Sequence, residues 1–174
     1  GEFLERRIEA REHDPPRDLV DMAAVVREVA GLLQLAAEKR GMSIDVDAAP
    51  DLPPVQGARD ELMQVVQNLV DNAIRYGRPG TAVRVRVATA PAEGAQRWVE
   101  LAVSDQGDGI APEHLPRLTE RFYRADSARS RALGGTGLGL AIVKHALIRH
   151  RGRLDIRSAV GEGSTFRVIL PAHE

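Results

Sequence analysis

The chain has 174 residues, of which 43% are hydrophobic and 28% charged, and its formal net charge is −1. This length suits one domain with a sizeable core, and the near-neutral charge gives no electrostatic case for nucleic-acid binding. The absence of cysteine excludes disulfides and thiolate metal sites. No apolar run approaches the ~20 residues that a membrane-spanning helix needs, and there is no signal-peptide pattern, so we expect a soluble fragment.

Residues 1–18 are predicted to form a linker. The segment from Leu4 to His13 is rich in charge and fits the tail of a preceding helix. The run Asp14-Pro15-Pro16 then interrupts any helix, because proline lacks the N–H group and restricts the residue before it. We therefore place the start of the folded domain at about residue 19.

A helix followed by a short strand is predicted next. The helix covers Asp21 to Arg40, with Asp21 as the expected N-cap and Gly41 as the expected stop. Its apolar residues recur at helical spacing, as Val25, Val26, Val29, Leu32, Leu33 and Ala36. The segment Ser43 to Asp47 alternates like a strand, and the proline-containing stretch 51–57 is predicted to be mainly a connector.

A second helix is predicted from a cap near Asp60 to a stop at Gly77. At about 100° per residue, one apolar face contains Leu62, Val66, Leu69 and Ala73. A polar stripe beside it contains Glu61, Gln64, Asn68, Asn72 and Arg75. Asparagine is a poor interior helix residue, so two of them four apart at the edge of a buried face are unusual. They are either solvent-exposed amides or ligands that offer amide oxygens to a hard cation such as Mg²⁺.

Two strand hairpins are predicted in the rest of the chain. Val83 to Val87 alternates strictly, with arginines on the wet side, and a turn segment at 90–96 leads to a strand at Arg97 to Ser104. Leu154 to Arg157 and Thr165 to Leu170 form the second pair. Strands in runs, with three helices elsewhere in the chain, predict an α+β fold built as a two-layer α/β sandwich.

Two glycine clusters suggest a phosphate site. The first, Asp105 to Gly109, follows a predicted strand, and the second, Gly134 to Leu140, opens a helix that runs on to Ile148. Glycine lets a ligand approach the backbone, and the free N–H groups of a first helical turn favour an anion. Glycines can also simply end strands and loops, but two clusters together with the asparagine stripe favour a ligand site.

Five motifs in this order resemble those of the sensor histidine kinases. They are Asn68 to Tyr76 (the N box), Asp105 to Gly109 (the G1 box), Arg121 to Arg124 (the F box), Gly135 to Leu140 (the G2 box) and Gly161 to Phe166, the last glycine motif. Their spacing fits from about Val20 to Pro171, and the segment from Ser130 to His145 is most similar to the phosphate-regulon sensor branch. The resemblance implies a catalytic and ATP-binding domain at 19–174, with the Bergerat fold of the GHKL superfamily. That fold has a mixed, mostly antiparallel sheet, three main helices and a flexible ATP lid, here at roughly 110–134.

The resemblance also implies roles for individual residues. Asp105 would accept a hydrogen bond from the adenine amino group, and Tyr76 would pack on the adenine face. Asn72 would bind Mg²⁺ with Asn68 nearby, and Asn68 and Arg124 would be catalytic. Gly107 and Gly109 would let the chain pass close to the nucleotide. The complete expected nucleotide-binding set is Asn68, Asn72, Arg75, Tyr76, Asp105, Gly107, Gly109, Ile110, Phe122, Arg124, Gly135, Thr136, Gly137, Leu138, Gly139 and Leu140.

Asn68 bears on the reaction type. The related ATP-hydrolysing machines (gyrase, the heat-shock 90 chaperones and mismatch-repair ATPases) carry a glutamate at this position, which serves as general base for water. An amide cannot accept a proton usefully at neutral pH, so we expect transfer of the γ-phosphoryl group rather than efficient hydrolysis. Glu61, on the same helix, leaves slow hydrolysis open.

The phosphoacceptor is expected outside this sequence. None of the five histidines, His13, His114, His145, His150 and His173, has the context of the family's phosphorylated histidine. The resemblance implies a dimerisation domain that carries this histidine and a response regulator receiver domain as partners. It further implies a cytoplasmic location within a membrane-anchored bacterial sensor, with a monomeric fragment and a homodimeric full-length protein. The alternatives are a nucleotide-binding scaffold without kinase output and an anti-sigma-type serine kinase.

Overall fold

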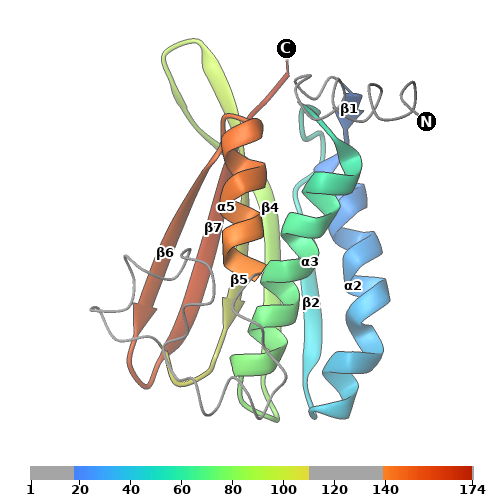
Figure 1. The fold of residues 1–174 in the computed structure, drawn as a ribbon, viewed down its shortest axis with the longest axis vertical. Coiled ribbons are helices and arrows are strands. Elements are labelled where there is room, and N and C mark those ends of the chain that lie inside the picture. The colour runs from blue at the N-terminus through green and yellow to red at the C-terminus, as the bar shows by residue number, and fades with distance from the viewer. Residues whose placement is uncertain (1–17, 110–138, 174) are drawn as a thin grey trace, which may run out of the picture.

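Three helices cover one face of a five-stranded sheet in the computed structural model, which describes residues 18–109 and 139–173 (Figure 1). The elements are β1 (Asp18–Val20), α2 (Met22–Lys39), β2 (Ser43–Ala48), β3 (Val55–Gly57), α3 (Arg59–Tyr76), β4 (Ala82–Glu93), β5 (Gln96–Asp105), α5 (Gly139–Arg149), β6 (Arg153–Ala159) and β7 (Gly163–Pro171). The predicted two-layer α+β sandwich is therefore confirmed. Within the described ranges, no helix is long and apolar enough to cross a membrane.

The strand order of the large sheet is β2-β4-β5-β7-β6. Strands β2 and β4 pair in parallel, and every other neighbouring pair in this sheet is antiparallel. Both predicted hairpins, β4–β5 and β6–β7, are confirmed. The segment predicted as a turn at 90–96 is shorter than expected, because β4 runs to Glu93 and β5 begins at Gln96.

A small second sheet was not predicted. Strand β3 lies in the segment expected to be a connector and pairs antiparallel with β1, with Val20 opposite Val55. Both of these valines are buried, at 2% and 0% exposure. Strands of three residues carry too little periodicity to be recognised in a sequence, so their pairing depends on the rest of the fold.

The two long helices begin in different ways. The predicted N-cap of α2 is confirmed, since the Asp21 side chain accepts the N–H of Ala23 at 3.0 Å. The predicted buried face is wrong in the second half of α2, where Leu32 and Ala36 are exposed and Ala37 is buried instead. The prediction that Asp60 caps α3 is wrong: Asp60 lies in the first turn, and the cap position is Ala58, whose side chain makes no capping bond. The imidazole of His150 instead accepts the N–H of Ala58 at 3.0 Å. The start of α3 is therefore held by a contact from another element.

The core lies between the helices and the sheet. The predicted apolar face of α3 is buried, with Leu62, Val66, Leu69 and Ala73 each at 2% exposure or less. The valines of β4 face these helices while the intervening Arg84 and Arg86 are exposed, as alternation predicts.

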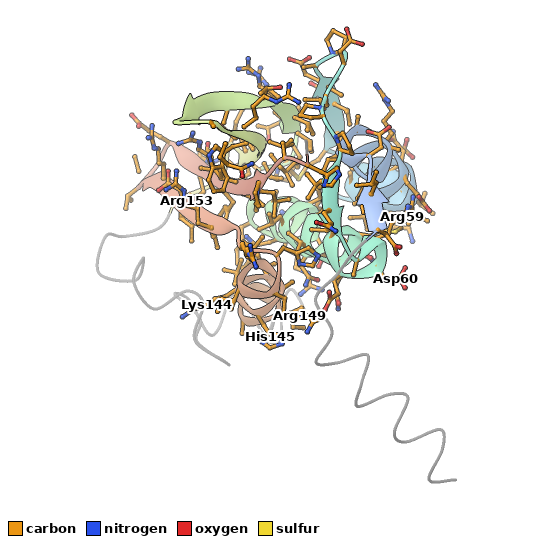
Figure 2. The ribbon with its side chains drawn as sticks, turned by 90° about the horizontal axis from the view of Figure 1, so that it is seen from above. Arg59, Asp60, Lys144, His145, Arg149 and Arg153 are labelled. Carbon is orange, nitrogen blue, oxygen red and sulfur yellow. The ribbon has the colours of Figure 1, made fainter. Side chains whose placement is uncertain are left out.

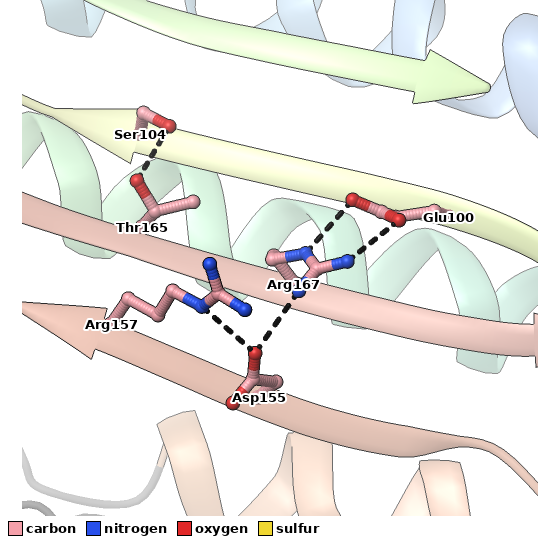
Figure 3. A network of polar contacts seen from close by, with 6 residues as sticks. All are labelled: Glu100, Ser104, Asp155, Arg157, Thr165 and Arg167. Atoms are coloured by element: carbon pink, nitrogen blue, oxygen red, sulfur yellow. Dashed lines mark hydrogen bonds and ion pairs between the residues drawn. The ribbon is translucent and has the colours of Figure 1, made fainter. Parts of the chain in front are cut away.

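The opposite face of the sheet carries a network of charges (Figure 3). The Arg167 guanidinium donates from Nε and Nη2 to the two carboxylate oxygens of Glu100, both at 2.8 Å. Its Nη1 lies 3.2 Å from an oxygen of Asp155. Hydrogen bonding from Arg167 holds the pKa of Glu100 below its usual range, and burial opposes this only in part. This face therefore carries paired charges in place of an apolar layer.

Candidate nucleotide site

Three of the predicted motifs meet along α3. In Figure 1, α3 and β5 both run toward the lower end of the molecule, and α5 begins higher up, beside the middle of α3. The amide nitrogen of Asn68 lies 3.4 Å from the carbonyl oxygen of Gly139, and Gly107 packs directly against the carbonyl group of Tyr76. Residues distant in the sequence are thus brought together as the motifs predict.

The side chains of Asn68 and Asn72 each carry an amide oxygen that is available as a ligand. Asn68 is half-buried, and because a carbonyl oxygen can only accept, its Nδ2 must face Gly139 and its Oδ1 must face away. Asn72 is also half-buried, and its amide makes no hydrogen bond within the described ranges. Hard cations such as Mg²⁺ prefer oxygen ligands, so these two amides fit a magnesium ion that is also held by phosphates and water.

The Arg75 side chain forms an ion pair within its own helix. Its Nε lies 3.1 Å from a carboxylate oxygen of Asp71, one turn earlier, and the two side chains are 33% and 40% exposed. An ion pair this exposed contributes little to stability and opens easily. A phosphate contact by Arg75 would therefore compete with this weak ion pair.

Asp105 is a buried carboxylate at the end of β5. It is 7% exposed, and its Oδ1 accepts the N–H of Gly107 at 2.9 Å. Burial raises the pKa of Asp105, and hydrogen bonds from the backbone of Gly107 and Ser164 offset part of that rise. An ionised carboxylate has more lone pairs than these two backbone donors use, so Asp105 retains acceptor capacity for an amino group of a ligand.

The glycines of the G1 box are required by the protein backbone itself. A Cβ at Gly107 would collide with the carbonyl oxygen of Tyr76, and one at Gly109 would collide with the carbonyl oxygen of Ala159. Gly109 also has a φ of 75°, which side chains rarely adopt. The expectation that these glycines serve the approach of a nucleotide stays a prediction, and their interlock with α3 and β6 is an additional reason for them.

The last glycine motif, Gly161 to Phe166, lies beside Asp105. A Cβ at Gly163 would collide with the carbonyl oxygen of Asp105, so β5 and β7 approach closely there. Ser164, the cross-strand partner of Asp105, is also 7% exposed, and its Oγ lies 2.8 Å from Ser158 Oγ. Neither serine was predicted as a site residue. Alternation with the buried Phe166 is the signal that could have placed Ser164 on this face.

Two arginines that were not predicted support the site from outside. Arg40 donates from Nε to the carbonyl oxygen of Ile74 and from Nη2 to that of Gly77, both at 2.8 Å. These bonds satisfy carbonyl groups at the end of α3, which has no later turn to bind them. Arg78 lies between two loops, with Nη2 at 3.5 Å from Asp108 Oδ1 and 3.3 Å from the Gly161 carbonyl oxygen.

Glu61 lies at the other end of α3. Its Oε1 accepts from Nε of Arg149 at 2.8 Å, and its Oε2 lies 4.0 Å from His150 Nε2. Figure 2 shows Arg149 projecting from α5 on the side of Asp60, at the start of α3, while Lys144 projects away from it. Asn68 is seven residues, or about 10 Å, further along the helix. This position gives no support to Glu61 as a base for hydrolysis at the site.

The remaining predicted residues lie outside the described ranges. They are Ile110, Phe122, Arg124, Gly135, Thr136, Gly137 and Leu138, together with the predicted lid at 110–134. The described part of the second glycine cluster consists of Gly139 and Leu140, which form the first residues of α5. A helix therefore begins where the G2 box predicts one.

Comparison with known sequences agrees with the motifs. Residues 57–174 match the family described as histidine kinase-, DNA gyrase B-, and HSP90-like ATPase. The phosphate regulon sensor protein PhoR of Pseudomonas aeruginosa is 44% identical over 164 residues, covering 94% of this chain and 36% of PhoR. The sensor-like histidine kinase SenX3 of Mycolicibacterium smegmatis is 41% identical over 174 residues, covering 99% of this chain and 44% of SenX3. The chain thus spans less than half the length of these relatives.

Solved structures show the same architecture. The full-length ShkA structure in complex with AMPPNP superposes with a TM-score of 0.77 at 26% identity, covering 92% of this chain and 32% of that one. A mycobacterial sensor histidine kinase, MprB, superposes with a TM-score of 0.72 at 30% identity, covering 90% of this chain and 98% of that one. From these matches and the shared motifs, the chain belongs to the histidine kinase-, DNA gyrase B- and HSP90-like ATPases and, within them, to the sensor histidine kinases.

Proposed function

We propose that this chain binds Mg-ATP and transfers its γ-phosphoryl group to a histidine on a dimerisation domain outside this sequence. The observation that carries the proposal is the buried Asp105 carboxylate, whose hydrogen-bonded neighbour Gly107 packs on the carboxyl end of α3, the helix that carries Asn68 and Asn72. The complex of the similar ShkA with AMPPNP supports an adenine nucleotide as the ligand.

Asp105 is proposed to read the base. An ionised carboxylate only accepts hydrogen bonds, so it suits the amino group of adenine and opposes the carbonyl oxygen of guanine. Two backbone hydrogen bonds hold the carboxylate in place before a ligand arrives. Tyr76, half-buried at the end of α3, is proposed to pack on the base.

The asparagines are proposed to act on the phosphates. Mg²⁺, when bound, would neutralise the charge of the phosphate oxygens, and the amide oxygens of Asn72 and Asn68 fit its coordination shell. Neither amide can remove a proton from water, so the described part of the site favours positioning over hydrolysis. Arg124 is proposed as a further catalytic group, together with the backbone N–H groups of the second glycine cluster.

The wider setting is proposed from the relatives. We propose residues 19–174 as the catalytic domain and 1–18 as the connection to the dimerisation domain. The partners would be that domain and a response regulator receiver domain, in a homodimeric sensor anchored in the membrane. The isolated chain would be a cytoplasmic, monomeric fragment.

Calorimetric titration with ATP tests the nucleotide site directly. The wild type is expected to bind ATP with a requirement for Mg²⁺ and to prefer ATP to GTP. Asn72→Ala and Asp105→Ala are each expected to weaken binding by about tenfold or more, which corresponds to one hydrogen bond to a charged group. Gln67→Ala removes an exposed amide from the same helix and is the matched control. Unchanged affinity in both site variants would overturn the site assignment.

A second experiment separates the reaction from binding. Radiolabelled ATP is mixed with the chain and either a histidine-bearing dimerisation domain or a serine-bearing protein partner. Acid-labile label on the histidine domain is the expected result. Label on serine would favour the anti-sigma-type kinase, and ATP binding without any transfer would favour the scaffold.

A further inference from the structure

Three polar side chains form a row across β5, β7 and β6 at the proposed adenine site around Asp105, which we call the adenine corner. Asp105 is the register partner of Ser164, which is in turn the partner of Ser158. Directly opposed residues project from the same face of a sheet, with Cβ atoms about 5 Å apart. The adjacent positions on that face, Val103 and Phe166, are paired with each other and buried in the core. The row therefore continues the buried face to its edge.

The hydrogen bonds within this row fix where the protons lie. Ser158 Oγ is 3.1 Å from the carbonyl oxygen of Gly163 and 2.8 Å from Ser164 Oγ. A carbonyl oxygen carries no proton, so Ser158 must give its single hydroxyl proton to Gly163. The bond between the two serines must then use the proton of Ser164. Ser164 Oγ is left with lone pairs and no proton to offer to a ligand.

The Asp105 carboxylate, next to Ser164 in this row, also offers only hydrogen-bond acceptors. The ionised carboxylate has only lone pairs, and Oδ1 is already engaged by the N–H of Gly107. Two neighbouring acceptors match a ligand amino group, which has two protons to donate. A ligand carbonyl oxygen placed there would meet acceptors only, and an unpaired buried polar group is costly.

We propose that Ser158 is a positioning residue that directs the Ser164 hydroxyl to accept, and so makes the corner select a purine with a 6-amino group. This inference rests on the proposed function, because it specifies how the adenine site discriminates. Without Ser158, the Ser164 hydroxyl is free to rotate and donate its proton to a 6-oxo group. ITP is the diagnostic ligand, since it differs from ATP only in carrying the oxo group and its N1 proton.

The chain offers a matched control. Ser104 and Thr165 form an equivalent hydroxyl pair between β5 and β7, at 2.9 Å, on the opposite face of the sheet (Figure 3). Ser104→Ala deletes one hydroxyl next to Asp105 in the sequence without reaching the proposed corner. It therefore measures the general effect of losing a hydroxyl pair in this sheet.

Affinities for Mg-ATP and Mg-ITP are measured by titration in the wild type, Ser158→Ala, Ser158→Thr and Ser104→Ala. The ATP-to-ITP preference is expected to fall about three- to tenfold in Ser158→Ala, the range for one neutral hydrogen bond. It is expected to persist in Ser104→Ala and in Ser158→Thr, which keeps the hydroxyl. Should the alanine variant fail to fold, Ser158→Val against Ser158→Thr gives the same comparison.

A double variant separates proton ordering from a general structural role. In the Ser164→Ala background there is no hydroxyl to direct, so adding Ser158→Ala is expected to leave the preference unchanged. An unchanged preference in Ser158→Ala alone, or an equal loss in both backgrounds, overturns the inference while the nucleotide site stands. Absence of ATP binding in the wild type overturns the proposed function and this inference together.

Discussion

The imidazole of His150 receives the backbone N–H of Ala58 on Nε2 at 3.0 Å, and its Nδ1 lies 2.7 Å from the carbonyl oxygen of Ala146. Since a carbonyl oxygen only accepts, Nδ1 carries the proton and the ring is neutral. The ring thereby joins the end of α5 to the start of α3. Gly57 leaves room for it, because a Cβ there would overlap the ring.

Loss of this ring is expected to destabilise the fold. His150→Ala would leave the Ala58 N–H without its partner and open a cavity, at a combined cost of about 2–4 kcal/mol. Urea unfolding measures the change. His145→Ala, at an exposed position on the same helix, is the control and should change the free energy of unfolding by about 0.5 kcal/mol or less. Similar values for the two variants would show that the His150 contact does not contribute to stability.

Two glycine substitutions are expected to act in opposite directions. Gly107→Ala places a Cβ against the Tyr76 carbonyl oxygen, and overpacking of this kind costs about 1–3 kcal/mol. Gly31→Ala adds a Cβ in an exposed helical position with nothing within 4 Å, which should stabilise by roughly 0.5–1 kcal/mol. Thermal unfolding of both variants checks the signs. Stabilisation by Gly107→Ala would contradict the backbone interlock.

The ion pair between Glu100 and Arg167, on the sheet face opposite the helices, should make the free energy of unfolding depend on pH. The pKa of Glu100 is lowered in the folded state, so its contribution is complete above the unfolded value of about 4.3 and is lost as pH falls through the folded value. Glu100→Gln should therefore cost about 1 kcal/mol at pH 7 and less in acid. Unfolding curves at pH 7 and pH 3 measure this. Asp47→Asn, which removes an exposed carboxylate on β2, is the control. An equal cost of Glu100→Gln at both pH values would refute the expectation.

Arg40 should link stability to nucleotide binding. Arg40→Met removes both bonds to the carbonyl groups of Ile74 and Gly77, with an expected loss of about 1–3 kcal/mol. Because these carbonyls flank Tyr76, we also expect weaker ATP binding at temperatures where the variant is folded. Titration after a melting curve tests both effects. Lys39→Met, exposed at the preceding position, should alter neither.

Elements with strong periodicity were predictable from the sequence, and features formed by distant contacts were not. The apolar face of α3 and the alternation of β4 predicted correctly which is a helix, which is a strand, and which side of each is buried. The start of α3 was predicted near Asp60 and lies at Arg59, but the contact that holds it could not be predicted, because its partner, His150, is 92 residues away from Ala58. The β1–β3 sheet was missed for the same reason.

The candidate site shows the same division. Asp105 and the glycine clusters stand out in the sequence because residue type and order are enough to recognise them. The collision that requires Gly107 depends on the path of Tyr76, and the Ser158–Ser164 pair depends on the register of β6 against β7. Such relationships exist only after the strands have aligned.

The pairing of β5 with β7 has a consequence for the order of folding. Ser104 and Thr165 are 61 residues apart, whereas the β4–β5 and β6–β7 hairpins close short turns. Closing a long loop costs more entropy, so the hairpins are expected to form first and the seam between them late. The corner containing Asp105 and Ser164 lies on this seam. A ligand bound there would hold contacts that are absent from the transition state, and would slow unfolding much more than it speeds folding.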